Sequence, residues 1–245
     1  GSALQTVGGS SSTTYANLSM NNLSTSGVTL NKPANVFGLL TLDNGNLNTT
    51  TTDILTLTST ATSDSGSATS FVNGPMVKQG STAFVFPVGK STKWARIGID
   101  SLGGSSDFRA EYFNTSYTCT SPVLAPLTNV SKKEYWLLDR LSGAAYADVK
   151  LFWEDAVWSD LSDDCDSLTV ARWNGSAWED KKRKTFSVYS SSCSASITGA
   201  GNIKSKSVPG FSPFTFGRKP DAGLPVSILD FTGLCADGKP VLRWS

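Results

Sequence analysis

The sequence predicts an all-β fold, and three observations support that prediction. Gly and Pro are frequent, with 22 and 10 residues among 245, and Ser, Thr and Asn are abundant. β-branched and polar residues alternate in many short runs, whereas apolar residues at helical spacing are nearly absent. Turn signals separate the runs. We expect an N-terminal β-roll or short β-helix followed by an antiparallel β-sandwich.

Residues 1–80 have the pattern expected of short stacked strands. Apolar runs at 27–30, 38–42 and 54–58 end in Thr-Leu or nearly so, and the Asp-Asn-Gly sequence at 43–45 is a strong turn signal between them. Corners rich in Asn and Thr suit a β-roll or a short parallel β-helix, although the spacing is too irregular for a sequence repeat. An antiparallel sandwich is the competing interpretation of this segment.

Charge is scarce in the same segment. The charged side chains before residue 81 are Lys32, Asp43, Asp53, Asp64 and Lys78. Hydroxyl-rich strands with little charge are common in extracellular repeat structures, and an ordinary low-charge β domain explains them equally well. The whole chain has a net charge of +1, so electrostatics predicts no nucleic-acid partner. No run approaches the ~20 apolar residues of a membrane-spanning helix.

Residues 81–220 are expected to form the β-sandwich, because their turn signals recur at the interval that sandwich strands require. The Asn-Gly turn within 173–178 predicts a hairpin with a Trp at each shoulder, a pattern that is usually cross-strand packing. The candidate strands are 107–113, 133–139, 148–153, 168–173, 187–189 and 214–217.

Residues 221–245 form a third segment, in which an apolar run at 226–231, an Asp-Gly turn at 237–238 and a second run at 241–244 predict two strands. Two strands alone cannot bury a core. We therefore expect residues 224–245 to pair with a neighbouring domain or with another copy of the chain, or to open a further module. We favour a cap on the sandwich of the same chain, because Cys235 could then reach Cys119.

Four stretches resemble one known family. They are Phe-Val-Asn-Gly-Pro at 71–75, Phe-Val-Phe-Pro-Val-Gly at 84–89, Phe-Ser-Pro-Phe-Thr-Phe-Gly at 211–217 and Leu-Pro-Val-Ser-Ile-Leu-Asp-Phe at 224–231. In this order they are similar to segments of large secreted surface proteins of Bacteroidota, which the type IX secretion system exports. The resemblance implies an extracellular or cell-surface location and indicates no biochemical activity.

The four cysteines are Cys119, Cys165, Cys193 and Cys235. An even number of cysteines in a β-rich, exported chain favours disulfides. We expect Cys165 to pair with Cys193 inside the sandwich, and Cys119 with Cys235 to tie the terminal segment to the body. Four cysteines allow three connectivities, and four buried free thiols are the alternative.

The triplet Asp-Ser-Leu occurs at 100–102 and at 166–168. It resembles the O-glycosylation site of exported Bacteroidota proteins. The resemblance implies that the hydroxyls of Ser101 and Ser167 carry glycans, although a three-residue pattern also arises by chance.

Two further sites are suggested by side-chain chemistry. Oxygen-rich loops bind calcium, and the candidate ligands lie in one run of seven residues: Asp160, Asp163, Asp164 and Asp166. The run lacks the spacing of an EF-hand, and solvated carboxylates are the alternative. Trp158 and Trp178 flank polar turns, so we expect them to be exposed and able to stack on carbohydrate. No other cofactor is indicated.

The chain contains no histidine, which removes Ser-His-Asp and Cys-His catalysis and histidine-metal sites. Glu154 and Asp155, beside Trp153 and Trp158, leave a glycosidase as a remote alternative to a solvated strand end. We expect no enzymatic activity. The chain is expected to be an extracellular structural or adhesive module of a cell-surface protein, such as a filament subunit, with surface glycans as candidate partners. The alternative is a carbohydrate-binding module associated with a secreted enzyme.

Overall fold

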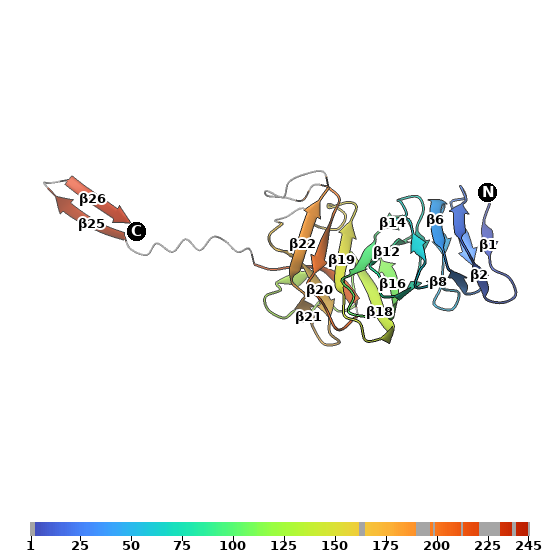
Figure 1. Cartoon of the computed structure of the whole chain (residues 1–245). Helices are drawn as coiled ribbons and strands as arrows, with labels where there is room; N and C mark the ends of the chain where they lie inside the picture. The colour runs from blue at the N-terminus through green and yellow to red at the C-terminus, as the bar shows by residue number, and fades with distance from the viewer. Residues whose placement is uncertain are drawn as a thin grey trace.

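The structure, a computed structural model, describes residues 3–161, 165–189, 197, 199–211, 213–220, 231–236 and 239–244, the last two ranges by their backbone alone. The described residues are strands, turns and loops, as the composition predicts (Figure 1). None of them forms a helix long and apolar enough to cross a membrane.

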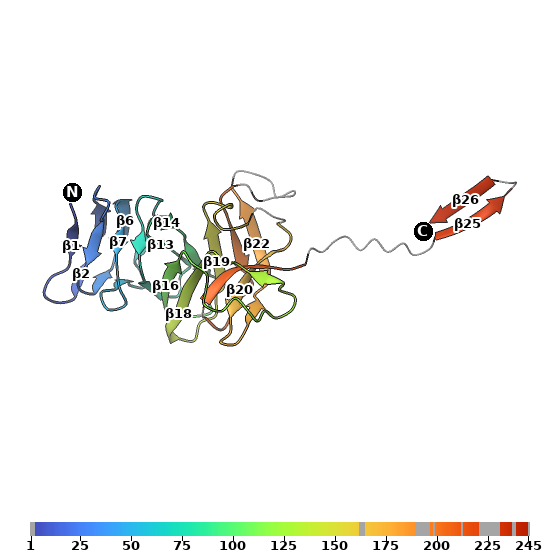
Figure 2. The same ribbon diagram turned by 180° about the vertical axis from the view of Figure 1, so that it is seen from behind.

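The N-terminal part is a short parallel β-helix whose first three coils each contribute one strand to three faces. The strands are β1 (Gln5–Val7), β2 (Thr13–Tyr15) and β3 (Leu18–Asn21); β4 (Val28–Leu30), β5 (Ala34–Val36) and β6 (Leu39–Asn44); β7 (Leu47–Asn48), β8 (Leu55–Leu57) and β9 (Thr62–Ser63). A fourth coil begins with β10 (Val72–Asn73) and β11 (Met76–Gly80). Figures 1 and 2 show the coils stacked in sequence from the N-terminus toward the sandwich.

Coil length varies, which explains why the sequence shows no repeat. Gln5 lies beside Val28, Val28 beside Leu47, and Leu47 beside Val72, all in parallel register. Successive coils are therefore 23, 19 and 25 residues long. The extra residues lie outside the strands, while Val28, Leu47 and Val72 place a buried aliphatic side chain at the same position of three successive coils.

The interior of the coils is aliphatic. Leu40, Leu47, Leu55 and Leu57 are fully buried, and the alternation of buried and less buried residues in each strand points them inward. Burying a Leu side chain stabilises a fold by about 1.5–3 kcal/mol relative to leaving it exposed. The three Thr-Leu runs noted in the sequence thus supply successive layers of one core.

The wide sheet continues from the coils into the sandwich. β11 pairs in parallel with β8 on one side and antiparallel with β16 on the other. At this junction Lys78 is buried, and its ammonium donates to the carbonyl oxygens of Thr58, Ser59 and Gln79 at 2.6, 2.9 and 3.0 Å. Burial lowers the pKa of Lys78. Residue 80, the expected domain boundary, therefore lies within one continuous sheet.

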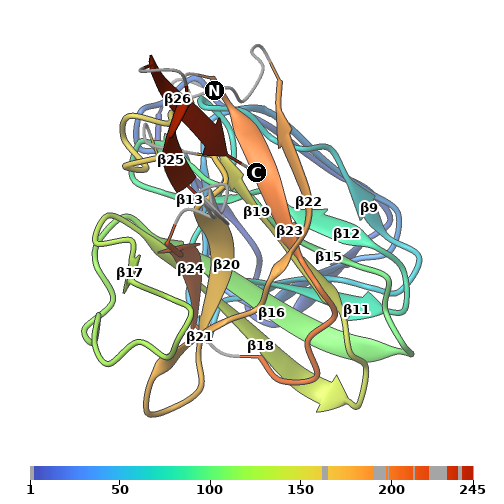
Figure 3. The same cartoon turned by 90° about the vertical axis from the view of Figure 1, so that its left-hand side faces the viewer.

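The sandwich strands form two facing layers. The wide sheet continues through β16 (Ser106–Phe113), β18 (Tyr135–Gly143), β24 (Pro213–Arg218), β20 (Leu168–Trp173) and β21 (Trp178–Asp180), with β17 (Asn129–Val130) beside β24. The second layer is β12 (Phe84–Phe86), β15 (Ile97–Asp100), β19 (Asp148–Trp153), β23 (Gly201–Ser205) and β22 (Arg183–Val188). The strands β13 (Val88–Lys90) and β14 (Lys93–Trp94) extend the first face of the coils. Figure 3 views the molecule along its long axis and shows the two layers on opposite sides.

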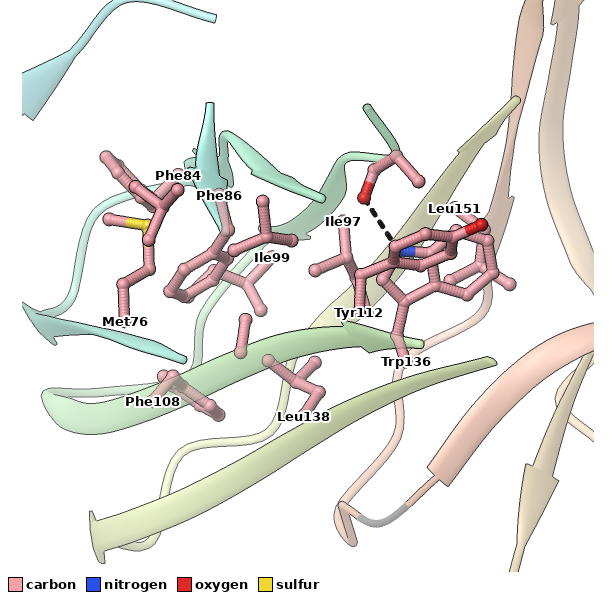
Figure 4. Close-up of a cluster of buried hydrophobic side chains, with 14 of the residues drawn as sticks. Met76, Phe84, Phe86, Ile97, Ile99, Phe108, Tyr112, Trp136, Leu138 and Leu151 are labelled. Atoms are coloured by element: carbon pink, nitrogen blue, oxygen red, sulfur yellow. Dashed lines mark hydrogen bonds between the residues drawn. The ribbon is translucent and has the colours of Figure 1, made fainter. Parts of the chain in front are cut away.

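Aromatic and aliphatic side chains fill the space between the layers (Figure 4). Phe86, Phe108, Tyr112 and Trp136 are fully buried. The indole nitrogen of Trp136 donates to the carbonyl oxygen of Ala95 at 2.9 Å, so its burial leaves no polar atom unsatisfied. The same core is continuous with the interior of the coils.

The C-terminal segment contains a hairpin formed by β25 (Phe231–Ala236) and β26 (Lys239–Trp244). Ala236 pairs with Lys239. The turn predicted between them, at 237–238, lies outside the described residues. Of the 226–231 run predicted for the first strand, the structure describes Phe231, which belongs to β25. Residues 221–230 lie outside the described residues.

Candidate functional site

The feature best suited to ligand binding is a hollow on the side of the β-helix. It has a volume of about 390 Å3 and is lined by residues 22–25, 44–46, 68–69 and 91–92. Each range is the corner of a successive coil, except that the last is the β13–β14 turn. We call this feature the corner groove.

Backbone hydrogen bonds hold the corners together from coil to coil. Asn22 N donates to Asn44 O at 2.9 Å, and Gly45 N donates to Thr69 O at 2.9 Å. The side chain of Asn22 is buried and donates to the carbonyl oxygens of Ala3 and Gly27, both at 3.0 Å. The corner backbone is therefore largely satisfied within the fold.

Glycine is needed where the corners approach each other. Gly45 has φ +78°, and a Cβ there would lie 2.2 Å from Asn22 O. Any other residue would face both a rarely adopted backbone conformation and a clash with the neighbouring coil. The Asn-Gly signal at 43–45 thus reports close coil stacking as well as a turn.

The corner groove is neutral. No charged side chain lines it. Thr25, Thr69, Ser91 and Thr92 are exposed, and Leu23 is 74% exposed. The surface combines hydroxyl and amide groups with one apolar side chain, a character that suits an uncharged polar ligand.

A second, much smaller cavity lies in the sandwich beside Glu134. It has a volume of about 30 Å3 and is lined in part by Lys93, Tyr112, Trp158 and Ser159. Glu134 is only 2% exposed, and Tyr112 Oη donates to its Oε2 at 2.7 Å. Glu134 Oε1 and Trp158 Nε1 have no hydrogen-bond partner of normal geometry among the described residues. The volume is sufficient for a water molecule and too small for a sugar ring.

Burial dominates the ionisation of Glu134. It raises the pKa of this carboxyl to about 7, against the opposing effects of the Ser159 and Tyr112 hydroxyls and of Lys93. Burial and the neighbouring Glu134 carboxylate together raise the pKa of Tyr112. The pair is a buried polar contact between β16 and the start of β18.

The carboxylates considered for glycosidase chemistry make structural contacts. Glu154 Oε1 accepts from Arg96 Nη2 and Nε at 2.6 and 3.0 Å. Asp155 Oδ1 accepts from the backbone N–H groups of Val157 and Trp158 at 3.0 Å each. Both carboxylates thus stabilise the turn that follows β19.

The expectation that Trp178 is exposed is wrong. Its side chain is 0% exposed, and its indole nitrogen donates to Cys119 O at 2.7 Å. The hairpin itself is as predicted, because Trp173 and Trp178 are cross-strand partners with ring centres 5.7 Å apart. Trp158 is half-buried, and the Lys93 ammonium lies 4.1 Å from its ring centre. Trp178 is therefore buried in a second, smaller core cluster and has no exposed ring face on which a sugar could stack.

The acidic run is only partly described. Asp160 is exposed, Asp166 has a side chain that is 79% exposed and lies 3.3 Å from Arg183, and Asp163 and Asp164 lie outside the described residues. Within the described part of the chain, no three acidic, Cys or His side chains cluster as metal ligands. A calcium site here stays a prediction.

The cysteines differ from one another. Cys165 is buried and disulfide-bonded, and its partner is not among the described side chains. Cys193 lies outside the described residues, and Cys235 is described by its backbone alone. Cys119 is an exposed free thiol, so the expected Cys119–Cys235 bond is absent from this structure. The Cys165–Cys193 pairing stays a prediction.

The two Asp-Ser-Leu triplets lie in different surroundings. Ser101 is exposed in the turn after β15, with φ +53°. Ser167 is only 6% exposed, and its hydroxyl lies 3.4 Å from Arg218 Nη1. A glycan on Ser167 would have to displace packed side chains, so the expectation for this residue is revised and Ser101 remains.

Comparison with protein-family models, with curated proteins and with solved structures found no match to this chain.

Neither the corner groove nor the Glu134 cavity is predicted by the sequence. Asn residues at 22, 44 and 46, together with Gly45, were the available signal for the groove. By themselves these residues indicate only turns, because the register that stacks one corner on the next is set by pairing over about twenty residues. Glu134 gave no signal, since its neighbour Tyr112 belongs to another strand.

Proposed function

We propose that the chain is an extracellular structural or adhesive module of a cell-surface protein. The observation that supports this best is the continuous sheet through which β11 joins the coil stack to the sandwich. A shared sheet and a shared core make one stiff, elongated unit, which is what a spacer or adhesive stalk requires (Figure 1).

Two edges of the molecule are suited to assembly. Among the described strands, β1, β2 and β3 each have a partner on one side only. Unpaired strand edges recruit further strands. The β25–β26 hairpin likewise pairs with no other described strand, and two strands alone are marginally stable. We propose that residues 224–245 pair with a neighbouring domain or with another copy of the chain.

Export by type IX secretion is proposed from the four sequence stretches that resemble exported Bacteroidota proteins. Ser101 is the proposed O-glycosylation site, because its hydroxyl is exposed in a turn. Glycopeptide mapping of protein purified from its native cells tests the modification. Detection of the unmodified Ser101 peptide alone would overturn it.

Cell fractionation and surface labelling test the location. Antibody against the chain should bind intact native cells, and added protease should remove that signal. A cytosolic marker, which must stay protected, is the control for cell integrity. Recovery of the chain only in the cytosolic fraction would contradict the proposal.

A carbohydrate-binding module is the second candidate function. The neutral, hydroxyl-rich corner groove is the observation that favours it, in place of the Trp residues expected from the sequence.

A further inference from the structure

We propose that the corner groove binds a neutral oligosaccharide that lies along the coil stack, across the corners of successive coils. This inference rests on the proposed adhesive function and adds to it a binding site and a ligand class.

The dimensions of the groove fit such a ligand. Its volume of about 390 Å3 lies within the roughly 300–1,000 Å3 that is usual for small-molecule sites. Neighbouring strands lie ~4.8 Å apart, so four stacked corners span roughly 14 Å. The groove is therefore elongated along the stack and can accommodate several sugar units in a row.

The groups that line the groove are free to bind. The hydroxyls of Thr25, Ser91 and Thr92 are exposed and make no hydrogen bond to any described residue. Asn44 donates its Nδ2 to Asn21 Oδ1 at 3.1 Å, which leaves Asn44 Oδ1 as an acceptor. Hydroxyls both donate and accept, so this set matches the hydroxyl groups of a sugar. Leu23, at 74% exposure, provides an apolar contact for the C–H face of a sugar ring.

The backbone of the corners argues against an extended peptide as the ligand. Strand addition requires free N–H and C=O groups along an edge. Here the N–H groups of Asn22 and Gly45 already donate to the next coil. Binding must therefore use side chains, which favours a polyhydroxylated ligand.

The absence of charge in the lining selects for neutral ligands. The nearby carboxylates are already engaged, because Asp64 accepts from Leu42 N and Gly66 N at 2.7 and 3.0 Å, and Asp43 lies 3.4 Å from Ser19 Oγ. No Lys or Arg lines the groove to pair with a sulfate, a phosphate or a uronic acid. Acidic glycans should bind more weakly than neutral ones of the same length.

Binding is tested with the full chain on a panel of neutral hexose, pentose and N-acetylhexosamine oligomers, with sulfated and uronic-acid oligomers for comparison. The affinity for the best neutral oligomer is then measured by calorimetry for a groove variant, Thr25→Lys with Thr92→Lys. The matched control is Thr14→Lys with Thr51→Lys, which adds the same charge at exposed sites of the coils outside the groove. Thermal unfolding midpoints verify that both variants fold.

We expect the groove variant to bind about tenfold more weakly or worse, a loss of about 1.4 kcal/mol or more, since it loses two hydroxyl partners. The control should bind like the parent. Equal loss in both variants, preferential binding of acidic oligomers, or binding of uncharged peptides in place of glycans would overturn the inference. Failure to bind any neutral oligomer, with the chain still found on the cell surface, would overturn the inference and leave the proposed function standing. Groove binding by a chain found only in the cytosol would overturn the proposed function alone.

Discussion

Glu134 shows how a single buried carboxyl connects packing to pH. It is enclosed by Tyr112, Trp158 and Ser159, and Lys93 and Asp155 are the charged groups that most influence it. Burial disfavours its charged form more than the hydroxyls and Lys93 stabilise it, so its pKa rises from 4.5 to about 7. The folded chain consequently binds a proton at pH values where the unfolded chain has released it.

The direction of the pH effect follows from linkage. Between pH 4.5 and about 7 the folded state binds more protons at Glu134 than the unfolded state. The contribution of this residue to stability is therefore fully present below pH 4.5 and is lost as pH rises to about 7. The loss is roughly 3 kcal/mol, given about 1.4 kcal/mol for each pKa unit.

Replacing Glu134 with Gln should remove this part of the pH dependence, because Gln keeps the shape and an acceptor for Tyr112 but does not titrate. The free energy of unfolding, measured in urea at several pH values between 4.5 and 8, should fall less steeply with pH than in the parent. Glu111→Gln is the control, since the Glu111 carboxylate lies on the neighbouring part of the same sheet, is 16% exposed and pairs with Lys90 at 3.5 Å. An identical pH profile for parent and Glu134→Gln would contradict the assignment.

The corners of successive coils in the β-helix are stacked in close contact. Backbone hydrogen bonds join each corner to the next, and a Cβ added at Gly45 would lie only 2.2 Å from Asn22 O. Coil length varies from coil to coil, while Val28, Leu47 and Val72 stay in register as buried aliphatic residues.

Gly45→Ala should destabilise the chain by about 2 kcal/mol or more, because a Cβ would clash at 2.2 Å with Asn22 O and the backbone has φ +78°. Gly175→Ala is the matched control. Gly175 also has positive φ, +103°, but an added Cβ there meets nothing within 4 Å. The free energy of unfolding in urea is measured for both variants, and the additional loss in Gly45→Ala measures the effect of the clash with Asn22 O. Equal losses would show that corner stacking tolerates a side chain.

Cys165, which is disulfide-bonded, lies in the loop that connects β19 to β20. Peptide mapping without reduction should recover Cys165 linked to Cys193, while Cys119 reacts with an alkylating reagent in the native protein because it is exposed and free. Reduction should then release the linked peptides. Recovery of Cys165 linked to Cys235, or of four alkylated thiols in the oxidised protein, would refute the pairing.

The two ends of the described chain differ. At the N-terminal end, β1, β2 and β3 each have one edge that pairs with no other described strand. The sandwich is followed in sequence by the β25–β26 hairpin. Neither the described part of β25 nor that of β26 pairs with a sandwich strand. The absence of the Cys119–Cys235 bond in the structure removes one reason to expect the hairpin to cap its own sandwich.

Deleting residues 224–245 should leave the thermal unfolding midpoint of the remaining chain unchanged, since the hairpin makes no strand pairing with it. Assembly should change instead: size-exclusion chromatography with light scattering should show that any oligomer of the full chain is lost on deletion. A fall of several degrees in the midpoint would show that the tail caps its own sandwich. Unchanged assembly together with unchanged stability would show that the tail is a connector only.

Local chemistry was sufficient to predict much of the fold. The all-β class, the stacked coils before the sandwich, and the turns at 43–45 and 173–178 all follow from alternation, glycine and asparagine. Several strands match closely: β19 and β20 lie at the residues predicted for them, 148–153 and 168–173. These features depend on the conformational preferences of neighbouring residues, which the sequence shows directly.

Tertiary structure alone decided which side chains are exposed and which are brought together. Trp178 and Ser167 both lie beside polar turns in the sequence and are nevertheless buried, because distant parts of the chain lie against them: the Cys119 loop at Trp178 and Arg218 at Ser167. The corner groove arises only when coils of unequal length are placed in register, and the raised pKa of Glu134 arises only when the fold buries its carboxyl. Exposure, cavities and proton affinity depend on long-range contacts, and for this reason the candidate site could not be predicted from composition and spacing.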